Sequence, residues 1–134
     1  MTSATAVLDE YLEHWNRRSG DWPDWWPDQT TLNGWTDRSA EKELELYDGL
    51  AELLARRYHA GDLSFEFCDW VANNVWHLMI TRDGSTRVFS DTLHELYEAF
   101  DAGEWSHFGK SSDPVTDYTN PAIAVIVARL SMQE

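Results

Sequence analysis

Three acids near the middle of the sequence have a spacing that could serve acid–base chemistry. Asp62, Glu66 and Asp69 follow one another at intervals of four and three residues, which would place their carboxylates on one side of a helix. A carboxylate-based hydrolase needs its acids in a cleft, in environments that separate their pKa values. Acids at the start of a helix are also favoured by the helix dipole alone. A hydrolase is therefore an alternative and not the leading hypothesis.

Metal binding and thiol chemistry have less support. His94 and Glu98 occur in the sequence HELYE and could share one helix face, but two ligands do not make a metal site. We therefore predict no metal and no other cofactor. The single cysteine, Cys68, is followed directly by Asp69, and an adjacent acid opposes the thiolate form that a nucleophile needs. These patterns predict no catalytic residue.

The strongest candidate for a functional surface is an acidic stretch followed by aromatic side chains. Residues 91–117 contain seven acids and one base, Lys110. Tight protein interfaces are usually built from aromatic anchors surrounded by charged groups, whereas an acidic helix face can also be an ordinary solvated surface. We predict that the following residues bind a partner protein: Asp91, Glu95, Glu98, Asp101, Glu104, Trp105 and His107.

The overall charge limits the classes of partner. The chain has 134 residues with 24 acidic and 10 basic side chains, which gives a formal net charge of −14. Binding to a phosphate backbone or to an anionic membrane requires a basic surface, so we expect neither nucleic acid nor a membrane as a partner. The same charge would steer a basic protein toward this one. The N-terminus lacks the regions of a signal peptide, which makes the cytoplasm the expected location.

Helices must position these residues, because apolar side chains recur at spacings of three and four through most of the chain. We predict an all-α fold in a single compact domain, residues 1–134. Asp83-Gly84 indicates either a small β-hairpin near residues 80–89 or a plain turn. The five predicted helices comprise residues 5–18, residues 39–59, a helix from after Asp62 or Ser64 to about Met79, residues 91–102, and a helix capped by Thr119 or Asn120.

Glycines and tryptophans add two further expectations. Gly61 and Gly103 follow the second and fourth helices, and we expect both to end their helices in the left-handed conformation. Residues 20–36 hold four tryptophans and two prolines and are predicted to form a long loop between the first two helices. We expect Trp25 or Trp26 to pack against one of these helices; a ligand cage or a self-association surface is the alternative.

Two segments of the C-terminal third, LHELYEAFDAGEWSHF and DPVTDYTNPAIAVIV, carry a further pattern. Its residues are Tyr97, Phe100, Asp101, Gly103, Glu104, His107, Asp113, Pro114, Tyr118, Thr119 and Pro121. The pattern resembles that of a set of small acidic bacterial proteins, some of which belong among immunity proteins of toxin systems. The resemblance implies an acidic, cytoplasmic protein that binds a partner, and it implies no enzymatic role.

The leading hypothesis is therefore a non-catalytic, immunity-like protein that neutralises a basic partner such as a toxin. A cleft that joins one of the three central acids to a histidine would favour the hydrolase instead. A flat surface of acids and aromatic residues would favour partner binding. A structural or regulatory module that self-associates through the tryptophan-rich loop is the third hypothesis.

Overall fold

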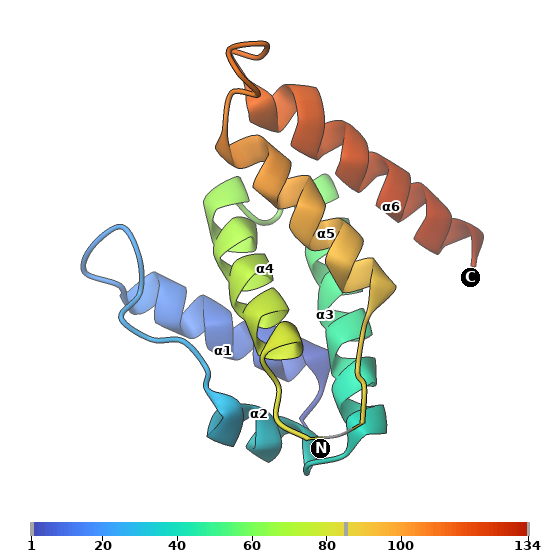
Figure 1. The fold of residues 1–134 in the computed structure, drawn as a ribbon. Coiled ribbons are helices and arrows are strands. Elements are labelled where there is room, and N and C mark those ends of the chain that lie inside the picture. Colours follow the sequence, from blue (N-terminus) through green and yellow to red (C-terminus); the bar gives the residue numbers. More distant parts are fainter. Residues whose placement is uncertain (1, 85, 134) are drawn as a thin grey trace.

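The computed structural model describes residues 2–84 and 86–133, and these residues form helices and no strand (Figure 1). The all-α prediction is confirmed, with six α-helices in place of the expected five. None of these helices has the length and apolar character needed to cross a membrane. The elements are α1 (Ala4–Arg17), α2 (Gln29–Thr36), α3 (Ala40–His59), α4 (Phe65–Ile80), α5 (Asp91–Asp101), the 3₁₀ helix η1 (Ala102–Glu104), the π-helix η2 (Val115–Thr119) and α6 (Asn120–Met132).

The starts of the helices follow from local sequence. The first five α-helices each begin after a serine or aspartate whose side chain accepts a hydrogen bond from the backbone N–H three residues later. Such a cap satisfies one of the N–H groups that a helix leaves unpaired at its start, and contributes about 1 kcal/mol. The capping residues are Ser3, Asp28, Ser39, Ser64 and Ser90, in chain order.

Helix α3 lies at the centre of the bundle. It packs against all five other α-helices, and Figure 1 shows it behind α4 and α5. Its inward side carries Leu46, Tyr47, Leu50 and Leu54, all essentially inaccessible to solvent. Each such side chain contributes about 1.5–3 kcal/mol by leaving water. Helices α5 and α6 lie side by side at the edge of the bundle, so each has one face on the core and one face toward solvent.

The expected loop at residues 20–36 is partly helical, because its last eight residues form α2. Asp28 caps this helix, and Leu32 and Trp35 bury their side chains in the core. The indole Nε1 of Trp35 donates a hydrogen bond to Glu10 Oε2 at 3.1 Å. Core packing and a good cap thus outweigh the helix-weakening effect of Gly34.

The two adjacent tryptophans of the loop have different environments. Trp25 packs against α1, where its ring stacks on His14 at 4.0 Å and meets Tyr11 edge-on at 5.3 Å between centroids. Trp26 is 69% exposed. The expectation that one of the pair packs against a neighbouring helix is therefore confirmed for Trp25.

The described residues of the connection between α4 and α5 form no hairpin. Residues 81–84 and 86–90 have no strand pairing, while Ser85 lies outside the described residues. Gly84 has a φ of +113°, a conformation that glycine adopts without strain. The plain turn, which was the alternative prediction at Asp83-Gly84, describes this segment.

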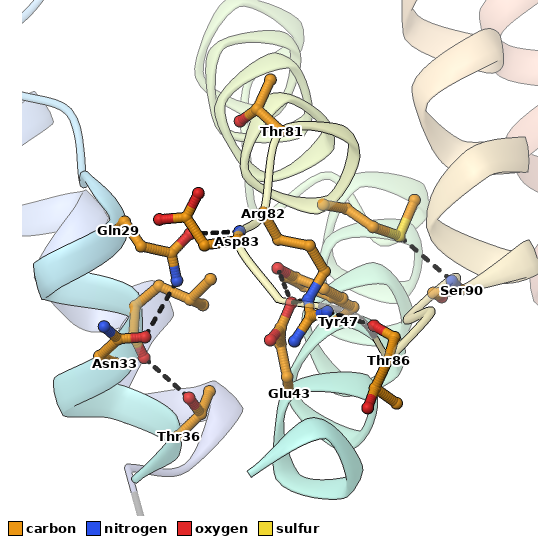
Figure 2. A network of polar contacts seen from close by, with 12 residues as sticks. Gln29, Asn33, Thr36, Glu43, Tyr47, Thr81, Arg82, Asp83, Thr86 and Ser90 are labelled. Carbon is orange, nitrogen blue, oxygen red and sulfur yellow. Dashed lines mark hydrogen bonds and ion pairs between the residues drawn. The ribbon is translucent and has the colours of Figure 1, made fainter. Parts of the chain in front are cut away.

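Side chains rather than a β-ladder fix this connection to the bundle (Figure 2). Arg82 Nε lies 2.8 Å from Glu43 Oε2, and the Tyr47 hydroxyl donates to the same carboxylate at 2.7 Å. The backbone N–H of Asp83 donates to Gln29 Oε1 at 3.3 Å. The carboxylate of Glu43 is almost completely buried, and these two partners offset the cost of removing it from water.

One of the two glycine predictions is confirmed and the other is wrong. Gly61 has a φ of +84° and ends α3 in the left-handed region. Gly103 does not adopt a left-handed φ, because α5 continues directly into η1 and no reversal is needed there. Gly103 is constrained by packing instead. A Cβ atom at this position would overlap Thr119 Oγ1 and lie 2.9 Å from Phe65 Cε2.

Candidate functional site

The acids predicted on α5 lie on its solvent side. Asp91, Glu95 and Glu98 are exposed, while the opposite side of the helix buries Leu93 and Phe100. This separation follows from the apolar periodicity of the helix, since residues three and four apart share a face.

Two of these acids already have partners within the chain. Glu95 Oε2 accepts a hydrogen bond from Arg129 Nη1 of α6 at 2.6 Å. Glu98 Oε1 lies 2.6 Å from His94 Nε2, one helical turn away. The His94 ring is in turn stacked on Trp76 at 5.0 Å. The acidic face of α5 is therefore partly neutralised before any partner arrives.

Asp101 and the exposed Glu104 differ from these three acids, because their carboxyl groups lie near α4. Both interact with Asp69, which is 5% exposed. Partial burial, reinforced by hydrogen bonds and charge from these two aspartates, raises the pKa of Glu104 to about 8. Glu104 therefore carries a proton at neutral pH and donates it to a neighbouring carboxylate. It adds no charge to the predicted acidic surface.

The three central acids that suggested a hydrolase have different environments. Asp62 and Glu66 are exposed, whereas Asp69 is buried and accepts a hydrogen bond from Asn73 Nδ2 at 3.1 Å. No histidine hydrogen-bonds Asp69 among the described residues. Burial raises the pKa of Cys68 to about 12, which suits a core residue and not a nucleophile.

Four aromatic residues form what we call the aromatic tip: Trp105, His107, Phe108 and Tyr118. The His107 ring lies between two of the others, 4.1 Å from Trp105 and 3.9 Å from Tyr118 between centroids. Its Nε2 atom lies 2.7 Å from the carbonyl oxygen of Ala102. Trp105 is 44% exposed and Phe108 is 91% exposed. The tip thus presents two large apolar side chains to solvent, with His107 and Tyr118 packed behind them.

The backbone of the tip adopts an unusual conformation. His107, Phe108 and Gly109 are consecutive residues with φ values of +54°, +61° and +80°. Such values are uncommon for residues other than glycine, and each costs about 1–3 kcal/mol unless the surroundings impose it. Here the loop is closed by hydrogen bonds from the N–H of Gly109 to Ser106 Oγ at 3.2 Å and from the N–H of Ser111 to Ser106 O at 3.1 Å.

A groove of about 460 Å³ between α5 and α6 continues from the aromatic tip. Tyr118 belongs to both, since it packs on His107 and also lines the groove. The groove is mainly apolar, and Val125 within it is 65% exposed. We call it the α5–α6 groove; its lining residues are Glu95, Glu98, Ala99, Ala102, Tyr118, Ala122, Val125 and Ile126.

The structure thus separates the predicted site residues and does not bring all of them to one surface. Trp105 and His107 lie in the aromatic tip, and Glu95 and Glu98 line the groove beside it. Asp91 lies at the far end of α5, in its first turn. The predicted set omitted Phe108, Tyr118 and Val125. For Val125 the sequence does contain a signal. Helix α6 has only one charged residue, Arg129, and a helix with so little charge is expected to be covered on all sides.

The tip and the groove offer apolar contact surface and negative charge. Among the described residues, no group of three or more histidine, cysteine, aspartate or glutamate side chains is placed to hold a metal ion. A family with known function would provide an independent guide to the role of this surface. No protein-family model matches the chain, and no curated protein or solved structure is significantly similar to it.

Proposed function

We propose that this protein is a non-catalytic binding protein whose aromatic tip contacts a positively charged protein partner. The observation that carries the proposal is Phe108, which is 91% exposed and held by a backbone in the left-handed conformation. Ordered loops with a strained backbone of this kind occur mainly at functional sites. A large, fixed and exposed aromatic side chain is the typical anchor of a protein interface.

Charge supports a basic partner. The net charge of −14 would steer a positively charged protein toward the molecule and would repel nucleic acid and anionic membranes. Glu95 and Glu98 add local negative charge at the groove that continues from the tip. A toxin neutralised in the cytoplasm is the form of this function that the sequence resemblance implies.

The test begins with capture of partners from the source cell on the wild-type chain and on Phe108→Ala. A partner that the wild type retains is identified by mass spectrometry, and its binding kinetics are then measured. We expect Phe108→Ala and Trp105→Ala each to raise the dissociation rate by about tenfold or more, because loss of a central anchor acts mainly on dissociation.

A matched control separates this effect from a general loss of exposed apolar surface. Ile80 is 55% exposed at the C-terminal end of α4, which lies at the other end of the bundle in Figure 1. Ile80→Ala should leave the dissociation rate unchanged. A basic partner that dissociates at the same rate from all three variants and from the wild type would contradict the proposal.

A further inference from the structure

Helix α6 leaves one apolar face without cover. Its inward side buries Ile123 and Ile126, yet its outward side is also apolar. Val125 is 65% exposed and Met132 is 86% exposed. The outward residues Pro121, Val125, Ala128 and Met132 are separated by four, three and four positions. This spacing is that of the seam along which one α-helix packs against another.

The α5–α6 groove meets this face at Val125 and has acids on one side. Val125 lies both in the outward seam and in the groove, next to Ala122. Glu95 and Glu98 of α5 form the acidic side. Tyr118 joins the groove to the aromatic tip, so an occupant of the groove would extend the contact made at the tip.

We infer that the α5–α6 groove is the seat of an amphipathic, basic α-helix of the partner protein, an inference that rests on the proposed function. The helix would lay its apolar stripe along Val125 and Ala122, as helices do in apolar grooves. Lysine or arginine residues beside that stripe would meet Glu95 and Glu98. The charge of the groove selects this occupant over a second copy of the chain. Two molecules that each carry a charge of −14 repel one another, and a copy would set acids against acids.

The experiment uses three synthetic helical peptides of about 18 residues, a length that spans α6 with its flanks. The first has a leucine stripe at heptad spacing with lysines beside it. The second has the same stripe with glutamates, and the third keeps the lysines but replaces each leucine with serine. Isothermal titration calorimetry with the full chain should detect binding of the first peptide, and binding at least about tenfold weaker for the other two.

Val125→Glu locates the binding site, because it makes the chain more negative while removing the apolar seat. The lysine–leucine peptide should bind this variant about tenfold more weakly, although charge alone predicts tighter binding. Leu44→Glu is the matched control, since Leu44 is an exposed apolar residue on α3 and receives the same added charge. It should not weaken binding. Glu98→Gln provides a second variant. Because Glu98 already pairs with His94, this variant should weaken binding only modestly, through slower association, and should reduce its dependence on salt.

Three results would overturn the inference. Equal binding of the serine peptide would show that charge alone attracts these peptides. Equal binding to the wild type and to Val125→Glu would place the site elsewhere. Dimerisation of the chain that Val125→Glu abolishes would assign the face to a second copy. The proposed function has its own test. A partner that dissociates at the same rate from the wild type and from Phe108→Ala would contradict the proposed function, whereas the peptide results would not change.

Discussion

Substitution of Gly103 by alanine tests whether close packing between η1 and η2 holds the base of the aromatic tip. The new Cβ atom would overlap Thr119 Oγ1 and lie 2.9 Å from Phe65 Cε2. Thr119 is fully buried and donates its hydroxyl to Ala99 O at 2.7 Å, so it cannot retreat without breaking that bond. Overpacking costs about 1–3 kcal/mol and a broken buried hydrogen bond about 1–3 kcal/mol. Alanine gives the unfolded chain less conformational entropy than glycine does, which offsets about 0.5–1 kcal/mol of this cost.

We therefore expect Gly103→Ala to lower the free energy of unfolding by about 1–5 kcal/mol, measured by urea denaturation followed by tryptophan fluorescence. Gly34→Ala in α2 is the first control, because a Cβ there meets nothing within 4 Å; it should stabilise the fold by about 0.5–1 kcal/mol. Gly61→Ala also has open space, but its φ of +84° should cost about 1–2 kcal/mol. If Gly103→Ala unfolds at the same urea concentration as the wild type, Thr119 and Phe65 move aside at little cost and the prediction is wrong.

Three other predictions concern stability. The pKa of Glu104 is raised from 4.5 to about 8, so its stabilising contribution is complete below pH 4.5 and is lost as pH rises through about 8. Glu104→Gln should flatten the fall of Tm over that range, and an unchanged pH profile would contradict this. Trp25→Ala should lower the free energy of unfolding by about 2–4 kcal/mol, and the exposed Trp26→Ala by under about 0.5 kcal/mol; equal effects would refute the packing argument. Arg82→Met should lower the free energy of unfolding by about 3–5 kcal/mol, because it leaves the buried carboxylate of Glu43 without its cation. Urea denaturation should show that the double variant with Glu43→Gln recovers much of this loss. No recovery would show that the ion pair is not the cause.

The helices could be predicted from the sequence because their signals are local. A capping serine followed by apolar residues at spacings of three and four identifies α3, α4 and α5. Helix α2 was missed because Asn33-Gly34 is typical of a turn. What stabilises α2 is burial of Leu32 and Trp35 against other helices, and such burial depends on the tertiary structure.

The details of the candidate site depend on contacts that the sequence does not reveal. Asp69 and Glu104 are far apart in the chain, and the packing of α5 against α4 brings their carboxyl groups together. The sequence therefore predicted Glu104 as a charged surface residue, whereas its raised pKa keeps it neutral. Phe108 directly follows the predicted residue His107, but its exposure follows from left-handed φ values that no aromatic residue prefers.

Charge and aromatic surface would therefore have separate roles in the proposed interface. Glu95 and Glu98 already pair with Arg129 and His94, so a partner's lysine would exchange one ion pair for another and gain little net energy. The excess of negative charge would still act at a distance and accelerate encounter, an effect that salt screens. Phe108 meets Trp105 edge-on and is 91% exposed, so most of its surface is available to a partner. The acids should consequently govern how fast the complex forms, and the aromatic tip how long it lasts.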